Sequence, residues 1–182
     1  MPEQRIIFTF ELPQQGEAKV MFSIDGIESE FELTNVCNPL GDMLSTMATM
    51  VTNPQQLWEG ENTAGFIWYC EAESYNWTLT ARANGTLNIL ITQSCEFFGD
   101  DEVEIVNGEC NTDEFIQVIV AELDRFIKAE GLLNYQQMWQ ANEFPITYLL
   151  ILKKHLIDCG KWIVEKNDNG TTLADETILL LG

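Results

Sequence analysis

The chain has 182 residues, of which 46% are hydrophobic, and this length suffices for one domain with a sizeable core. That apolar content excludes an acidic disordered chain, although the formal net charge is −20. A charge of this sign also excludes a surface that binds the phosphate backbone of nucleic acid or an anionic membrane, because both need Lys and Arg.

Alternating apolar and polar residues predict strands over the first third of the chain. The alternation covers residues 6–12, 20–24 and 27–33, and Asp25-Gly26 is a strong hairpin signal between the last two. In the third of these strands Glu28, Glu30 and Glu32 alternate with apolar or small residues. We therefore expect one buried face and one strongly acidic face exposed to solvent.

From Pro39 onwards the apolar residues follow a helical period instead. Asn38 is a candidate N-cap, Pro39 suits the first helical position, and Asn53-Pro54 ends the helix. The Met-rich stripe of this helix is interpreted as core filling rather than as a binding groove.

Strands return in the middle of the chain. The alternation over 66–71 and 75–81 predicts two strands, and Asn84-Gly85 leads into a third over 87–91. Trp68 and Trp77 fall on apolar faces, so we expect both indoles in the core. The acidic stretch 97–110 is interpreted as a connection with a short edge strand near Val103 and Ile105, followed by the Asn107-Gly108 turn signal.

The last third is predicted to be helical. Asn111 begins a helix that Gly131 ends, a short helix carries Tyr135 and Trp139, and Pro145 opens a further helix. The apolar end 178–181 is interpreted as a final strand or as a segment that docks on a neighbour.

This order of elements predicts an α+β fold in which an antiparallel sheet carries the C-terminal helices on one face. We expect a single domain over 1–182, in which 161–182 either belongs to the domain or forms a short appendage.

The acidic residues are concentrated in the middle of the chain. Between Val20 and Asp124 there are nineteen Asp and Glu residues and one basic residue, Arg82. Such a field attracts a basic protein surface. The residues predicted to bind that partner lie on the acidic strand and on the acidic connection: Glu28, Glu30, Glu32, Asp100, Asp101, Glu102 and Glu104.

A second interpretation uses the Trp-rich hairpin. Glu71 and Glu73 lie two residues apart and resemble the acid and base that flank a sugar, with aromatic residues nearby for stacking. The ligand-binding residues of this alternative are Trp68, Glu71, Tyr75 and Trp77. The competing reading is a solvated pair of glutamates above core aromatic residues.

The cysteine and histidine pattern gives no catalytic or metal motif. The five cysteines are scattered without a C-x-x-C pair, which favours reduced thiols and a cytoplasmic protein without signal peptide or membrane helix. We predict a surface or structural role for His155, the only histidine, and treat its spacing to Cys159 as incidental. We expect no catalytic residue, no metal and no cofactor.

Several aromatic and turn residues resemble those of small bacterial proteins, some of which are similar to immunity proteins of toxin systems. The resemblance spans residues 35–157 but departs at Ala72-Glu73, where the related pattern has Pro-Gly. It rests on Asn38, Pro39, Leu40, Trp68, Glu71, Tyr75, Trp77, Tyr135, Trp139, Phe144 and Pro145.

Two functional hypotheses follow. The first is a non-catalytic acidic interaction protein of the immunity type, which occludes a basic partner such as a toxin nuclease. The alternative is a domain that binds a carbohydrate-like ligand, or hydrolyses it, at the Trp-rich hairpin. Because the sequence offers no set of nucleophile, base and oxyanion donors, it favours the first.

Overall fold

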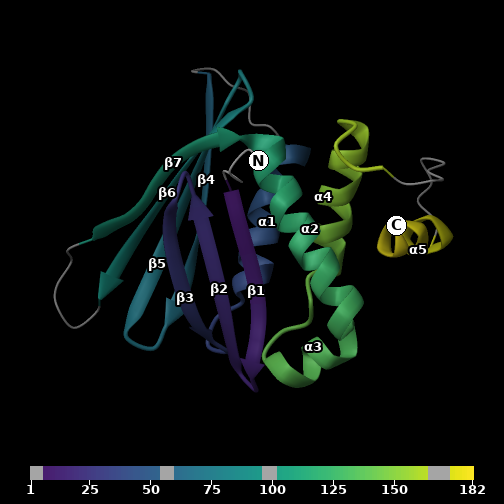
Figure 1. Cartoon of the computed structure of the whole chain (residues 1–182), viewed down its shortest axis with the longest axis horizontal. Coiled ribbons are helices and arrows are strands. Elements are labelled where there is room, and N and C mark those ends of the chain that lie inside the picture. The colour runs from purple at the N-terminus through teal and green to yellow at the C-terminus, as the bar shows by residue number, and fades with distance from the viewer. Residues whose placement is uncertain (1–5, 54–59, 96–101, 164–172) are drawn as a thin grey trace.

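Two blocks of strands, each followed by helices, make up the chain in the computed structural model, which describes residues 6–53, 60–95, 102–163 and 173–182 (Figure 1). The strands are β1 Ile6–Gln14, β2 Glu17–Ile24, β3 Ile27–Thr34, β4 Glu61–Cys70, β5 Glu73–Arg82, β6 Thr86–Cys95 and β7 Val103–Asn111. The helices are α1 Pro39–Thr52, α2 Thr112–Glu130, α3 Leu132–Trp139, α4 Ile146–Asp158 and α5 Leu173–Leu181.

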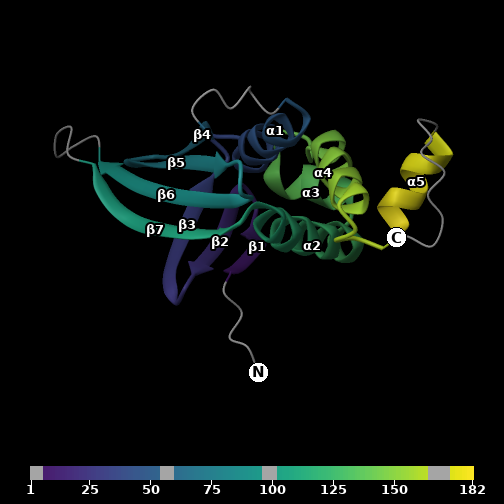
Figure 2. The same cartoon turned by 90° about the horizontal axis from the view of Figure 1, so that it is seen from above.

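The predicted α+β class is confirmed, and the strands are divided between two antiparallel sheets. One sheet has the order β1-β2-β3, and the other has the order β4-β5-β6-β7. Helix α2 packs on β1, α1 packs on β4, and α4 contacts both α1 and α2, so the helices lie together on one side of the molecule (Figure 2). None of the helices in the described ranges combines the length and apolar character needed to cross a membrane.

Aromatic side chains fill the space where the two sheets meet. The ring of Phe31 on β3 lies 5.4 Å from that of Trp68 on β4 and 5.6 Å from that of Trp77 on β5. Trp68 is 0% exposed and Trp77 is 1% exposed, which confirms that both belong to the core. The Trp68 indole also donates a hydrogen bond to the carbonyl of Pro39, so it fixes the start of α1 against the second sheet.

The hairpin turns agree with the sequence signals, except within β7. Asp25 and Gly26 both have positive φ angles, of 51° and 81°, as expected for a two-residue turn between β2 and β3. Asn107-Gly108, in contrast, lies inside β7 and makes no turn. A Cβ atom at Gly108 would lie 2.9 Å from the side chain of Ile24, so the glycine allows β7 to pass close to the first sheet.

The predicted helix ends are confirmed, and of the two alternatives for residues 178–181 the final strand is wrong. The side chain of Asn38 accepts a hydrogen bond from the backbone of Gly41, and Asn111 caps α2. Gly131 ends α2 with a φ of 81°. Residues 178–181 belong to helix α5, which contacts α4. A short apolar run has no period that separates a strand from a buried helix, and here the helix is formed.

A buried ion pair that the sequence pattern did not reveal joins α2 to α4. Lys153 is 1% exposed, and its Nζ lies 2.6 Å from Oδ1 of Asp124, whose other oxygen lies 2.9 Å from Nζ of Lys128. Burial lowers the pKa of Lys153, while the hydrogen bond to Asp124 opposes that change. The pair favours the observed packing of the two helices, because separating them would take the carboxylate of Asp124 away from the buried ammonium of Lys153.

Candidate functional site

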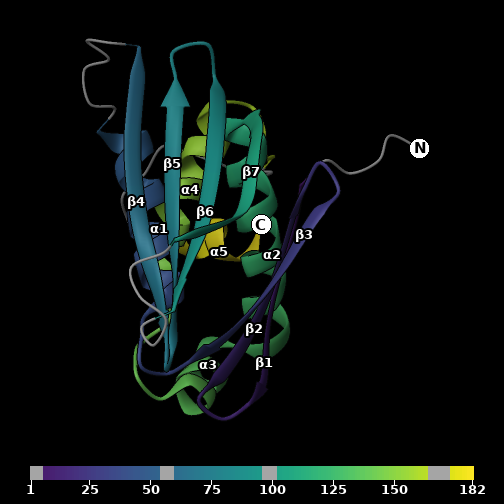
Figure 3. The same ribbon diagram turned by 90° about the vertical axis from the view of Figure 1, so that its left-hand side faces the viewer.

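A groove with a volume of about 790 Å³ lies between the end of the first sheet and the turn from β4 to β5. Figure 3 shows why the two meet: the β1–β2 turn and the β4–β5 turn lie at the same end of the molecule. The thiol of Cys70 at the end of β4 donates a hydrogen bond to the carbonyl of Glu32 on β3, at 3.3 Å. The groove is lined by Pro13, Gln14, Glu17, Ala18, Lys19, Glu30, Glu32, Leu33, Thr34, Cys70, Glu71, Ala72, Glu73 and Tyr75.

The charged groups of this lining are very unequal in number. One ammonium group, that of Lys19, faces five carboxylates, which gives a formal charge of −4. The strand register places Lys19 between Glu11 on β1 and Glu32 on β3, and its Nζ lies 2.9 Å from a carboxylate oxygen of Glu30. The hydrogen bond with Glu30 is the main reason why the pKa of Lys19 is raised, and the charges of Glu30, Glu32 and Glu11 add to it.

The five carboxylates of the groove differ in their partners. Glu30 pairs with Lys19, and Glu73 accepts hydrogen bonds from the hydroxyl of Tyr75 and the side-chain amide of Gln93, both at 2.7 Å. Within the described part of the chain, the other three make no side-chain hydrogen bond and no ion pair. These three are Glu17, Glu32 and Glu71, and all are exposed. The groove therefore offers three unpartnered carboxylates to a ligand.

The titrating groups next to these carboxylates are held in their neutral forms. Burial raises the pKa of the Cys70 thiol to about 12, and the charge of Glu73 adds to the effect. Burial is the main reason why the pKa of Tyr75 is raised well above its usual value, and the hydrogen bond to Glu73 adds to the effect. A protonated thiol is a poor nucleophile. The carboxylates of the groove, in contrast, can bind a cation by charge and by hydrogen bonds.

The residues of the alternative interpretation do not form a stacking platform. Trp68 and Trp77 are buried in the core, so neither indole is available to a sugar. Glu71 belongs to the turn after β4, whereas Glu73 is the first residue of β5, so the two glutamates do not share a strand face as expected. Glu71 and Tyr75 do line the groove, but as parts of its acidic wall.

The residues predicted to bind a basic partner are distributed over different surfaces. Glu30 and Glu32 line the groove. Glu28 is exposed on the same strand, but it lies opposite Ser23 of β2 in the strand register and does not line the groove. Glu102 and Glu104 lie at the β7 edge of the second sheet, while Asp100 and Asp101 lie outside the described residues. Of the described residues in this set, Glu30 and Glu32 are the ones that line the groove.

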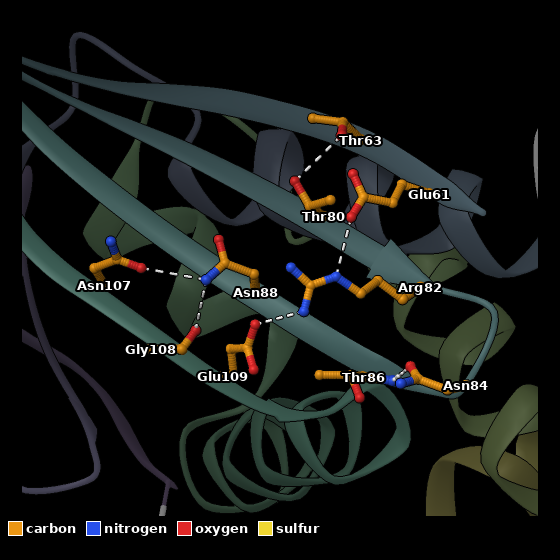
Figure 4. Close-up of polar contacts among 10 residues, drawn as sticks. All are labelled: Glu61, Thr63, Thr80, Arg82, Asn84, Thr86, Asn88, Asn107, Gly108 and Glu109. Atoms are coloured by element: carbon orange, nitrogen blue, oxygen red, sulfur yellow. Dashed lines mark hydrogen bonds and ion pairs between the residues drawn. The ribbon is translucent and has the colours of Figure 1, made fainter. Parts of the chain in front are cut away.

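The outer face of the second sheet also carries carboxylates, but there they have hydrogen-bond partners (Figure 4). The guanidinium of Arg82 donates to Glu61 on one side, at 3.0 Å, and to Glu109 on the other. Around it the threonines and asparagines bond to one another across the strands, as Thr63 does with Thr80 at 3.2 Å. Many polar side chains of this face therefore bond to one another.

Three charged residues of the groove, Glu17, Lys19 and Glu73, were not among the site residues predicted from the sequence. Glu17 and Lys19 precede the apolar alternation of β2, and Glu73 was considered only as the partner of Glu71 in an acid–base pair. A signal for the first two existed in the strand period, which places them on the same side of the sheet as Glu30 and Glu32. The contribution of Glu73 depends on packing between the sheets, which no local pattern reports.

No protein-family model matches the chain, and no curated protein or solved structure matches it either. The resemblance to immunity proteins therefore stays an expectation from sequence motifs. The groove is characterised by its own residues, and their excess of carboxylates is the property that points to a ligand class.

Proposed function

We propose that this protein is a non-catalytic interaction protein whose acidic groove binds a basic segment of a partner protein. The observation that carries the proposal is the charge of the groove, in which five carboxylates face one lysine and three of them have no hydrogen-bond or ion-pair partner among the described residues. A Lys or Arg side chain entering the groove would gain charge-assisted hydrogen bonds, which are stronger than neutral ones. It would also neutralise part of the repulsion among the carboxylates.

The mechanism that we propose is occlusion of a basic surface. The acidic field of the protein accelerates encounter with a positively charged partner, and the groove then covers the basic residues that the partner uses. A toxin that cleaves nucleic acid fits this role, because its substrate site has to be basic. An immunity-type inhibitor would block such a site without any chemical step.

The first experiment identifies the partner and tests its charge. The protein is immobilised and used at low salt to capture proteins from a bacterial lysate, which are identified by mass spectrometry. We expect a basic protein whose association rate with the purified chain falls steeply as salt is raised, since screening weakens electrostatic steering. A captured partner whose association rate does not change with salt concentration would contradict the proposal.

The second experiment locates the binding surface with two variants of equal charge. One variant carries Glu17→Lys, Glu32→Lys and Glu71→Lys in the groove; the control carries Glu28→Lys, Glu104→Lys and Glu176→Lys at exposed positions outside it. We expect the groove variant to associate with the partner more slowly by at least tenfold beyond the control. Equal slowing by both variants would mean that net charge alone, and not the groove, determines recognition.

A further inference from the structure

Three side chains with metal-binding atoms converge where the end of α4 meets the start of α2. Nε2 of His155 lies 2.9 Å from Oδ1 of Asp113 and 3.7 Å from Sγ of Cys159. All three ligand atoms lie within 4.8 Å of one another. The helical spacing puts His155 and Cys159 on one face of α4, and the packing of α2 against α4 brings in Asp113, which is 42 residues away from His155 in the chain.

The arrangement of the three atoms does not suit nucleophilic catalysis. In a Cys–His–Asp triad the thiol bonds to one ring nitrogen and the carboxylate orients the ring through the other. Here both Sγ of Cys159 and Oδ1 of Asp113 approach the same nitrogen, Nε2 of His155. The carboxylate therefore cannot orient the ring through one nitrogen while the other nitrogen takes the proton of the thiol. Atoms that gather around a single point are instead typical of the ligands of one metal ion.

The distances also agree with a metal site. Zinc binds His nitrogen and carboxylate oxygen at about 2.0 Å and Cys sulfur at about 2.3 Å in a tetrahedron, so neighbouring ligand atoms lie about 3.3–3.6 Å apart. The distances of 2.9 Å and 3.7 Å to Nε2 bracket these values. Sγ of Cys159 and Oδ1 of Asp113 lie within 4.8 Å of each other, so a side-chain movement of about 1 Å would suffice to bring all three atoms to one ion.

The mixture of ligand types selects among metals. A thiol, an imidazole and a carboxylate together favour a borderline-soft ion such as Zn²⁺ over Ca²⁺ or Mg²⁺, which prefer oxygen ligands only. Cys159 is exposed, while His155 and Asp113 are partly buried, so an ion can enter and a water molecule can occupy the fourth position. The thiolate is the form of Cys159 that would bind the ion, so binding would release the thiol proton.

We propose that Asp113, His155 and Cys159 bind one Zn²⁺ ion, which links the end of α4 to the start of α2. This site is independent of the acidic groove, which none of its three residues lines. It revises the expectation of no metal, which rested on spacing along the chain and could not include the contribution of Asp113. Because the ion would bind the folded chain and not the separated helices, it would stabilise their packing.

The test uses Co²⁺ as a spectroscopic probe for the zinc position, in reduced protein from which any affinity tag has been removed. We expect one equivalent of Co²⁺ to give a thiolate-to-cobalt charge-transfer band, and one equivalent of Zn²⁺ to remove it. The chain contains one histidine, so the imidazole signals in the NMR spectrum report on His155 alone and should shift on addition of Zn²⁺. Zn²⁺ should also raise the melting temperature.

Variants decide whether the three named residues form the site. Cys159→Ser should abolish the charge-transfer band, and Asp113→Asn should weaken Zn²⁺ binding by about tenfold or more, since even loss of a supporting residue costs 10–100-fold. Cys95→Ser is the control, because Cys95 lies on β6 outside the cluster, and it should keep the band. A band that survives Cys159→Ser, the absence of any band, or an unchanged His155 signal would each overturn the proposal.

Discussion

The groove and the outer face of the second sheet are both acidic sheet surfaces with one basic residue each, but they differ in how many of their carboxylates have hydrogen-bond partners. On the outer face, Arg82 lies between Glu61 and Glu109, and Asn76 and Thr92 donate hydrogen bonds to Glu102. In the groove one lysine lies among five carboxylates and forms an ion pair with Glu30. The comparison teaches that two acidic surfaces can differ less in their number of carboxylates than in how many of these have partners among the described residues.

The physical origin of the difference is strand register. Glu61 lies directly opposite Arg82, and Glu109 is on the same face two strands away, so a single long side chain reaches both. In the first sheet Lys19 has carboxylates on both neighbouring strands and bonds to only one of them. The groove then gains two further carboxylates, Glu71 and Glu73, from the other sheet, with no additional base.

The largest effect should come from the aromatic core beneath both surfaces. Trp68→Ala should lower the free energy of unfolding by about 3–5 kcal/mol, because the buried indole leaves a cavity and its hydrogen bond to Pro39 is lost. Ile67, the preceding residue, points to the outer face and is 37% exposed, so Ile67→Ala should cost about 1 kcal/mol or less. Urea unfolding followed by circular dichroism measures both. Equal losses would show that the assignment of the two faces of β4 is wrong.

An intermediate effect should appear in alkaline solution, through the buried thiols. The pKa of Cys37 is raised from 9.0 to about 11 and that of Cys70 from 9.0 to about 12, mainly by burial. Below pH 9 these thiols are neutral in both states; above it the unfolded chain loses their protons first, so stability falls until the folded pKa is reached. Each thiol contributes a slope of at most about 1.4 kcal/mol per pH unit.

The check is the stability of the parent and of Cys70→Ser, each measured by urea unfolding at several pH values between 9 and 12. The variant should lose stability less steeply with pH than the parent, because it lacks the titration of this thiol in the groove wall. Cys37→Ser should reduce the slope in the same direction up to about pH 11. Parallel curves for all three proteins would contradict the assigned burial of the thiols.

The smallest effect is the one that tests the comparison most directly, because its sign differs between the two surfaces. The triple variant Glu17→Gln, Glu32→Gln and Glu71→Gln removes repulsion in the groove and should raise stability by about 0.5 kcal/mol per site or less at low salt. A matched variant on the outer face carries Glu61→Gln, Glu102→Gln and Glu109→Gln, which takes away the partners of Arg82 and should lower stability. The same sign for both variants would mean that the groove carboxylates are already compensated.

The sequence by itself determined most of the local structure. Period-2 and helical alternation, together with the cap residues Asn38 and Asn111 and the Asp25-Gly26 turn, located most elements and placed Trp68 and Trp77 in the core. These signals are strong because each arises from residues close together in the chain, whose geometry depends little on the rest of the fold. The same strand period predicted that Glu30 and Glu32 would be exposed.

Only the tertiary structure decided which of these elements meet. The division of the strands into two sheets, the approach of the β4–β5 turn to β3 and the convergence of Asp113 with His155 all join residues that are far apart in the chain. Helix α5 likewise depended on packing, because its apolar residues suit either a strand or a helix. Charge and periodicity describe single elements, whereas a site needs the distances between elements, and those are set by how the core packs.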